Sequence, residues 1–531
     1  MRNYHLAGRS PTIARSGMAA TSHPLASLAA IDCLKRGGNA IDAAITATAL
    51  LCVIEPAMTG IGGDCFALIH KPGTGPGNGL IALNGSGRAP RAATADWYAK
   101  AGIKEIAVTT PHAVTVPGAI DAWSRLIRDH GTISLGEALA PAIDAAEHGF
   151  PVAPRVSSDW AGLADKINGH AGARQHLLRD GRTPRAGEIM RFPALAGTLK
   201  RIARDGRDAF YTGEIAADIV ATLKALGGLH TIEDFAAQSS TYVTPIGVPY
   251  HGVELYELPP NNQGIVGLIL LKMLTRLGPL GDAHSPERYH VMMEAARLAY
   301  AVRDRFVSDP DTLSAPISHM LSDSLIDDLV RRIDRRRHRA DLGPIPQPKG
   351  SDTTYLTVAD RHGMTVSFIN SLFAGFGSGI VTLKTGVVLQ NRGTGFVLDP
   401  KHPNCIGPGK RPMHTLVPAM ALKDGKPWLS FGVMGAAFQP MGHVYVLSNM
   451  VDHTMDVQEA IDFPRIFFEG GKLQAEESVP EPTLRALSAL GHTIDRRPDP
   501  WGGGQAIMID RANGVLHGGS DGRKDGLALG Y

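Results

Sequence analysis

Two consecutive threonines, Thr353 and Thr354, stand where the chain changes from a Pro/Gly-rich segment to alternating apolar and polar residues. The segment "LGPIPQPKGS" (342–351) predicts an exposed connector, and such connectors tolerate being cut. If the bond between Asp352 and Thr353 were broken, Thr353 would carry a hydroxyl and a free α-amine. Because an α-amine has a pKa of about 7.7–8.0, it can act as general base for that hydroxyl. The same hydroxyl can first attack the preceding carbonyl and make the cut. The residues alone leave two interpretations open, a threonine nucleophile or an ordinary strand start.

Two other segments have residue types that can bind ligands. The glycine-rich "KPGTGPGNG" (71–79) lacks the Gly-Lys-Ser/Thr end of a phosphate loop, so we expect a hairpin loop between "CFALIH" and "GLIALNGSG". The basic run "RRIDRRRHRAD" (331–341) can be a nucleic-acid patch or a solvated helical face. In a nearly neutral chain we favour the helical face.

The elements that position these residues follow from the periodicity of the sequence. Residues 22–55 predict two helices, with Asn39 as the cap of the second, and 118–330 are mostly helical. After Asp352 the period becomes two, and the predicted strands are "TTYLTVAD", "MTVSFINS", "GVVLQN", "TLVPAMAL", "PWLSFGV" and "GQAIMID". Helices are expected near 438–462 and 481–491. Helices followed by strands indicate an α+β protein whose sheets lie between helices.

Composition narrows the class of partner. The chain has 531 residues, 44% hydrophobic and 20% charged, with a formal net charge of +2. These values are typical of a globular protein that binds a small molecule, with neither nucleic acid nor membrane as partner. The N-terminus has no secretory apolar run, so we expect a cytoplasmic protein. The four cysteines are too scattered for a disulfide framework or a metal site. We expect no cofactor and no metal.

The chain resembles the γ-glutamyltransferase family over nearly its whole length. The resemblance rests on these stretches in order: "ATSHPLASLAAIDCLKRGGNAIDAA", "TGIGGDCFALI", "VTVPGAIDAW", "LAPAIDAAEHGFPV", "DAFYTGEIAADIV", "YELPPNNQGIVGL", "AYAVRDRFVSDP", "DTTYLTVAD", "FGSGIV" and "GPGKRP". It implies an N-terminal-nucleophile hydrolase fold, a four-layer αββα sandwich. It also implies a zymogen that cleaves itself autocatalytically into a large subunit, 1–352, and a small subunit, 353–531, which together form one core.

The catalytic part of the family pattern is retained. The resemblance implies that Thr353 is the nucleophile and that cleavage falls between Asp352 and Thr353. Ser371 stands where the family has a threonine that hydrogen-bonds the nucleophile. Gly435 and Ala436 occupy the place of a Gly-Gly pair whose amides form the oxyanion hole. Replacing the second glycine by alanine leaves both backbone N–H groups in place if alanine can adopt the required backbone dihedrals.

The substrate-binding part of the pattern is altered. Ser86 replaces the arginine that binds the glutamyl α-carboxylate in the family, and Arg88, two residues on, is a candidate replacement. In "NRGTGF", Asn391 is followed by Arg392 where the family has residues that bind an ammonium group. An arginine there repels an ammonium and attracts a carboxylate. The usual Ser-Ser pair that completes carboxylate binding is replaced by two further candidate substrate-binding residues, His414 and Thr415.

We therefore expect a self-processing amidohydrolase of the glutathione hydrolase-like branch. It would transfer a γ-glutamyl-type acyl group from Thr353 to water or to an amine. The first alternative is an acylase for glutaryl and other dicarboxylic monoamides, as in cephalosporin acylases, because Arg392 suits an acyl group without an amine. The second alternative, from another class, is an unprocessed binding protein without catalysis.

Overall fold

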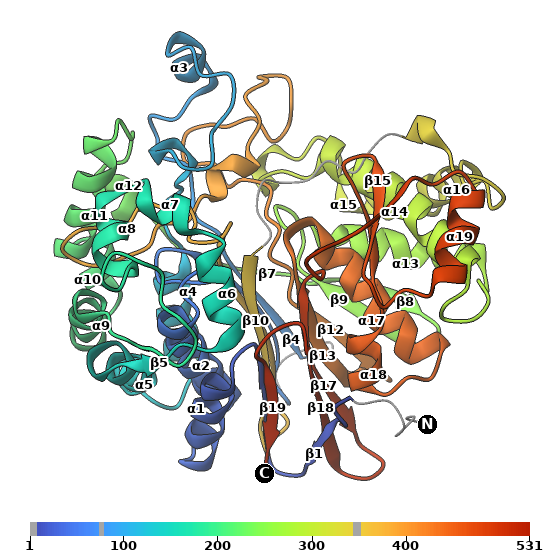
Figure 1. Ribbon diagram of the computed structural model, residues 1–531, viewed down its shortest axis with the longest axis horizontal. Helices are drawn as coiled ribbons and strands as arrows, with labels where there is room; N and C mark the ends of the chain where they lie inside the picture. Colours follow the sequence, from blue (N-terminus) through green and yellow to red (C-terminus); the bar gives the residue numbers. More distant parts are fainter. Residues whose placement is uncertain (1–7, 74–78, 343–351) are drawn as a thin grey trace.

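Two seven-stranded antiparallel sheets form the centre of the protein (Figure 1), for which a computed structural model describes residues 8–73, 79–342 and 352–531. The first sheet has the order β1 (Thr12–Ala14), β18 (Val515–Ser520), β17 (Gly503–Asp510), β13 (Lys426–Met434), β12 (Ala419–Lys423), β9 (Val253–Glu257) and β8 (Ile246–Tyr250). The second has the order β19 (Leu527–Gly530), β2 (Met18–Thr21), β10 (Asp352–Ala359), β11 (Thr365–Phe373), β3 (Asp64–His70), β4 (Leu80–Gly85) and β7 (Thr241–Val243). Each sheet combines strands from before and after residue 352.

Helices cover the outer face of each sheet (Figure 1). The second sheet is covered on the left of the view by a group that precedes residue 240: α1 (Pro24–Lys35), α2 (Ala40–Ile54), α4 (Ala119–His130), α5 (Leu135–His148), α6 (Pro154–Ala161), α7 (Ala164–Asn168), α8 (Ala171–Leu177), α9 (Pro193–Asp205), α10 (Arg207–Tyr211), α11 (Glu214–Ala225) and α12 (Ile232–Ala236), with α3 (Ala95–Lys100) above them. The first sheet is covered by α13 (Ile265–Leu277), α14 (Pro286–Phe306), α15 (Ile317–Met320), α16 (Asp323–Arg331), α17 (Gln439–Asp452), α18 (Val457–Asp462) and α19 (Glu481–Ala489).

Strand β3 shows how the sequence produces four layers. Cys65, Ala67 and Ile69 belong to the core between the second sheet and its helices. Phe66 and Leu68 point to the other side and pack between the sheets. Because successive side chains of a strand alternate between faces, an apolar strand of this kind is buried on both sides. The fold is therefore the predicted α+β sandwich with the layers αββα.

The predicted helix cap at Asn39 is confirmed, and two other helices begin in the same way. Asn39 caps α2, and Ser134 and Thr231 begin α5 and α12, each through a capping box. In such a box, two otherwise unpaired backbone N–H groups find acceptors, which fixes where the helix starts.

Three predictions about secondary structure were wrong. Helix α16 ends at Arg331, so the basic run 331–341 is mostly turns, with a short 3₁₀ helix, Ala340–Leu342, at its end. "GVVLQN" (386–391) makes isolated bridges, such as Leu389 with Gly62, and no strand. The order of helices first and strands later also fails, because strands of both sheets precede residue 260 and their short apolar runs are weak signals. Residues 343–351 of the predicted connector do not belong to the described part of the chain.

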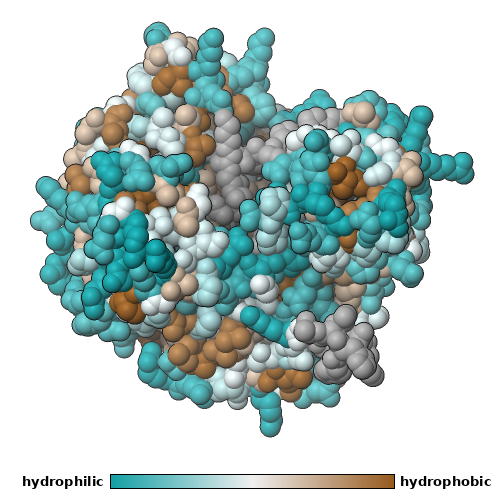
Figure 2. All heavy atoms as spheres, viewed as in Figure 1, coloured by the Kyte–Doolittle hydropathy of each residue, from teal (hydrophilic) through white to brown (hydrophobic). Residues whose placement is uncertain are grey.

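The surface is mostly hydrophilic on the face that Figure 2 shows, and apolar side chains form small groups. Large exposed apolar side chains among the described residues are far apart in the sequence: Ile13, Leu28, Ile189, Leu226 and Leu383. Isolated residues of this kind are normal on a protein surface. Within the described parts of the chain, none of the helices has the length and apolar character of a membrane span.

Candidate active site

Thr353 and Ser371 lie on neighbouring strands and contact each other. Strand β10 has a bulge between Asp352 and Thr354, so its pairing with β11 shifts at Thr353. The Thr353 hydroxyl, 1% exposed, donates to Ser371 Oγ at 3.1 Å. Ser371 Oγ also accepts from the Phe373 amide at 2.7 Å. The candidate nucleophile is thus held beside a second hydroxyl whose own position is fixed by the backbone.

The Gly435–Ala436 turn lies at the end of the sandwich where β10 begins. Between the sheets, Thr357 Oγ1 is 2.7 Å from Ser430 Oγ, and a Cβ atom on Gly432 would lie 2.4 Å from the Tyr355 ring. The two strands therefore run in opposite directions, which brings Thr353 level with the C-terminal end of β13. The turn follows β13 directly, with φ of 127° at Gly435 and 47° at Ala436. A left-handed alanine is strained, and such strain clusters at functional sites.

Gln263 links this turn to the predicted substrate-binding residues. Its Nε2 donates to Ala436 O at 2.8 Å and to Thr415 O at 3.2 Å. Its Oε1 accepts from Arg303 Nη1 at 2.9 Å. Gln263 is fully buried, so these bonds fix the turn relative to Thr415. Sequence reasoning missed this residue, although it lies in the family-like stretch "YELPPNNQGIVGL".

Arg392 places its guanidinium group inside the protein. The side chain is 1% exposed, and Nη1 donates to Thr415 Oγ1 at 2.7 Å. The guanidinium carbon lies 4.1 Å from the centre of the Phe373 ring. Among the described residues, neither Nε nor Nη2 has a hydrogen-bond partner. Burial lowers the pKa of Arg392 to about 9, and Asp64 partly opposes this change. A buried cation with two free donors on one edge is suited to bind a carboxylate.

Asp64 and His414 form a buried pair next to Arg392. Asp64 Oδ2 accepts from His414 Nε2 at 3.1 Å, and Asp64 Oδ1 accepts from the amides of Gly87 and Gly118, both at 3.0 Å. Burial raises the pKa of Asp64 to about 6 and, with Arg392 nearby, holds the pKa of His414 well below its usual value. Because His414 Nδ1 accepts from the Leu416 amide at 3.2 Å, the ring is neutral with its proton on Nε2. His414 therefore orients Asp64. Asp64 is a second residue of the site that the sequence did not predict.

Arg88 and Asn391 have other partners. Arg88, whose side chain is 31% exposed, donates to Gly409 O at 2.9 Å and lies 4.0 Å from Asp309. Asn391 accepts from the Ala374 amide at 3.1 Å through Oδ1, which supports the backbone after Phe373. The structure therefore brings together Thr353, Ser371, Arg392, Thr415, Gly435 and Ala436 through shared contacts, and leaves Arg88 in a separate set of interactions.

A cavity of about 340 Å³ lies against the Gly435 turn. Met58, whose carbonyl accepts from the Leu372 amide at 3.4 Å, lines it beside Met434 and Gly435. Its charged lining residues are Arg155, Asp159, Arg497, Asp499 and Lys524. The cavity therefore borders the turn at Gly435 and has a largely polar lining.

Known proteins resemble this chain over nearly its whole length. The family model described as Gamma-glutamyltranspeptidase matches residues 26–531. The chain is 36% identical over 526 residues to the glutathione hydrolase-like YwrD proenzyme of Bacillus subtilis (strain 168), covering 97% of this chain and 98% of that protein. It is 34% identical over 538 residues to the oxamate amidohydrolase proenzyme of Klebsiella pneumoniae, covering 98% and 100%. The crystal structure of a cephalosporin acylase from Bacillus halodurans matches with a TM-score of 0.93 and 38% identity, covering 100% and 98%.

Proposed function

The chain belongs to the gamma-glutamyltranspeptidase family, and from this premise we propose that it is a proenzyme that becomes an amidohydrolase by cutting itself before Thr353. The two products are residues 1–352 and 353–531. Similarity to relatives described as proenzymes supports the cut, and the contact between Thr353 and Ser371 supports its position.

The cut is an acyl shift followed by hydrolysis. Thr353 Oγ1 attacks the carbonyl carbon of Asp352, the bond from that carbon to the Thr353 nitrogen breaks, and the nitrogen takes up the hydroxyl proton. Water then cleaves the ester, which leaves a carboxylate on Asp352 and a free α-amine on Thr353. Ser371 Oγ accepts the hydrogen bond of the Thr353 hydroxyl and so orients it for the attack.

The mature site uses the same hydroxyl. The α-amine of Thr353 takes the proton of Oγ1, because its pKa lies near neutrality, and Oγ1 attacks the amide carbonyl of the substrate. The amides of Gly435 and Ala436 donate to the oxyanion that forms. The amine leaves with the proton, and water or another amine releases the acyl group from the ester.

We assign the substrate as the monoamide of a dicarboxylic acid. The observation that carries this choice is the buried Arg392, whose Nε and Nη2 find no acceptor among the described residues while Nη1 holds Thr415. The free carboxylate of the acyl group would accept two hydrogen bonds from that edge. Oxamate, for which one relative is named, is the shortest monoamide of this class, and a glutaryl amide is a longer one.

A γ-glutamyl amide is the second candidate, and Asp64 is the observation that favours it. Asp64 Oδ2 accepts only from His414 in the described residues, so it keeps capacity for an ammonium group. Arg392 and Asp64 together would then bind the α-carboxylate and the α-amine of a glutamyl group.

Side-by-side assays separate these candidates. Processed wild-type protein and the Thr353→Ala variant are given oxamate, glutaryl p-nitroanilide and γ-glutamyl p-nitroanilide. We expect turnover of oxamate or the glutaryl amide by the wild type and none by the variant. Preference for the γ-glutamyl amide would select the second candidate. A processed protein that turns over none of the three would refute both, and a chain that remains whole would favour a binding protein.

A further inference from the structure

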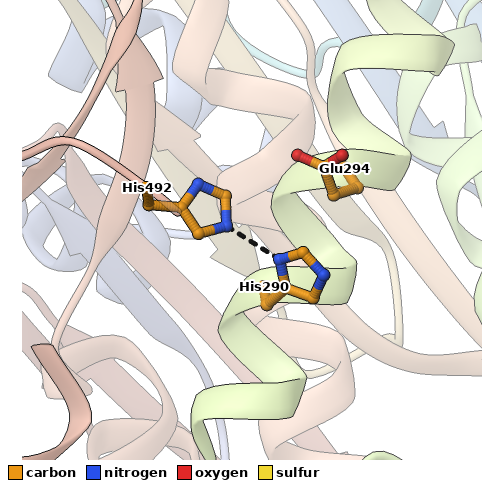
Figure 3. A group of neighbouring side chains, drawn as sticks. All are labelled: His290, Glu294 and His492. Atoms are coloured by element: carbon orange, nitrogen blue, oxygen red, sulfur yellow. Dashed lines mark hydrogen bonds between the residues drawn. The ribbon is translucent and has the colours of Figure 1, made fainter. Parts of the chain in front are cut away.

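Three buried metal-ligating side chains converge far along the chain from the residues discussed above. His290 and Glu294 are one turn apart on α14, and His492 follows α19 (Figure 3). Their ligand atoms all lie within 4.8 Å of one another. His290 and Glu294 are 0% exposed and His492 is 4% exposed. Charged or polar groups are rarely buried together without a partner that they share.

The hydrogen bonds of His290 prepare it to bind an ion. Its Nε2 lies 2.8 Å from the carbonyl oxygen of Asp334, which can only accept, so the proton of the neutral ring is on Nε2. The lone pair of Nδ1 then points at His492 Nε2, 2.7 Å away. A backbone carbonyl that holds the far nitrogen is the usual support of a metal-binding histidine.

His492 is the incompletely satisfied member of the group. If His492 Nε2 donates to His290, its Nδ1 must accept, yet Nδ1 is buried and has no partner among the described residues. A zinc ion would take the lone pairs of His290 Nδ1 and His492 Nε2, and the rings would separate from their present 2.7 Å, because two nitrogens on one tetrahedral zinc lie about 3.4 Å apart. The proton of His492 would then be on Nδ1, where a water molecule would accept it.

Glu294 and His338 complete the surroundings. Glu294 Oε1 accepts from Arg297 Nη1 at 2.9 Å, and Oε2 accepts from the Arg339 amide at 3.1 Å. Arg297 Nη1 also donates to Arg339 O at 2.7 Å, so it keeps a partner when the carboxylate turns towards an ion. His338 Nδ1 is 2.9 Å from Glu294 Oε1, and its ring centre is 4.5 Å from that of His492. His338 therefore borders the group through Glu294, while the ligand atoms that all lie within 4.8 Å of one another belong to His290, Glu294 and His492.

We propose that His290, Glu294 and His492 bind a zinc ion, with a water molecule in the fourth position. Two histidines and a glutamate are an established zinc ligand set, and zinc with three protein ligands takes water as its fourth. His290 and Glu294 precede Thr353 in the sequence, and His492 follows it. The ion would therefore fasten the parts of the chain on either side of the proposed cut. The site does not depend on the chemistry of Thr353, so an uncut Thr353→Ala protein should bind zinc as well.

The test counts zinc on the full-length protein. Wild type, Glu294→Gln, His492→Gln and His148→Gln are stripped with a chelator, given zinc sulfate, passed through gel filtration and analysed by mass spectrometry of the metal. His148 is the matched control, since its side chain is 70% exposed on the surface. We expect about one zinc per chain in wild type and His148→Gln, and at least a tenfold loss in the other two. Wild type without zinc, or full retention by Glu294→Gln and His492→Gln, would overturn the proposal.

A second measurement keeps the test valid if the variants do not fold. X-ray absorption at the zinc edge of the wild type should show nitrogen and oxygen ligands with imidazole scattering. A sulfur ligand, or a shell of oxygen atoms without imidazole, would place the ion elsewhere and refute the assignment.

Discussion

Replacing Arg392 by glutamine tests the assignment of the acyl-binding group. Nε and Nη2 have no acceptor among the described residues and would both bind the expected carboxylate, and each charge-assisted hydrogen bond contributes about 1.5–3 kcal/mol. Glutamine restores one neutral hydrogen bond of about 1 kcal/mol. The net loss of transition-state stabilisation is therefore about 2–5 kcal/mol, or roughly 30- to 5,000-fold in kcat/KM.

The assay compares two acyl groups of the same length. Glutaryl p-nitroanilide ends in a carboxylate and pentanoyl p-nitroanilide ends in a methyl group. We expect Arg392→Gln to lose activity on the glutaryl substrate and to change by less than about threefold on the pentanoyl one. Thermal melting checks that the variant is folded.

Arg88→Gln is the matched comparison, because the same change is made at an arginine that already pairs with Gly409 O and Asp309. We expect less than about a tenfold loss on the glutaryl substrate. Equal losses on both substrates in Arg392→Gln, or a larger loss in Arg88→Gln, would refute our reasoning about Arg392.

The other predictions concern processing, pH and packing. Ser371→Ala removes the acceptor of the Thr353 hydroxyl and should slow self-cleavage about 10- to 100-fold in a gel time course, whereas an unchanged rate would contradict its role. Burial raises the pKa of Glu55 to about 7, so the folded state holds a proton that the unfolded state releases, and stability is lost as pH rises from about 4.5 to about 7. The free energy of unfolding of Glu55→Gln, measured with urea, should therefore rise relative to that of wild type by up to about 3 kcal/mol across that pH range. A difference between the two proteins that does not change with pH would contradict this. Gln263→Leu leaves Ala436 O and Thr415 O without their buried donor and should cost about 1–3 kcal/mol with a matching fall in kcat, while retention of both would show that the turn needs no such support.

The presence of several helices and their caps could be predicted because these signals are local. Asn39 and Asp42, for example, satisfy each other's backbone within one turn. Among the strands before residue 260, β3 and β4 form the predicted hairpin. Strands β1, β2, β7, β8 and β9 were missed, because a short apolar run has the same appearance in a strand and in a buried helix. Residues 386–391 show the opposite error, because a strand was predicted there. Their apolar side chains are buried, but the segment forms only isolated bridges.

The residues of the candidate site could likewise be predicted only in part. Thr353 could be proposed from its own chemistry, because nucleophile and base are one residue. Asp64 could not, since its partner His414 is 350 positions away, and Gln263 contacts Ala436 across 173 positions. The departure at Arg392 was visible in the sequence, but its meaning needed the contacts with Thr415 and Phe373.

The identity of the N-terminus of the mature protein tests the central claim most directly. Purified wild-type protein is separated by denaturing electrophoresis, and each band is sequenced from its N-terminus. We expect two fragments, the second beginning Thr353-Thr354-Tyr355-Leu356, and one uncut chain for Thr353→Ala. A wild-type protein that remains whole, or one whose second fragment begins at another residue, would contradict the proposal that Thr353 is the nucleophile.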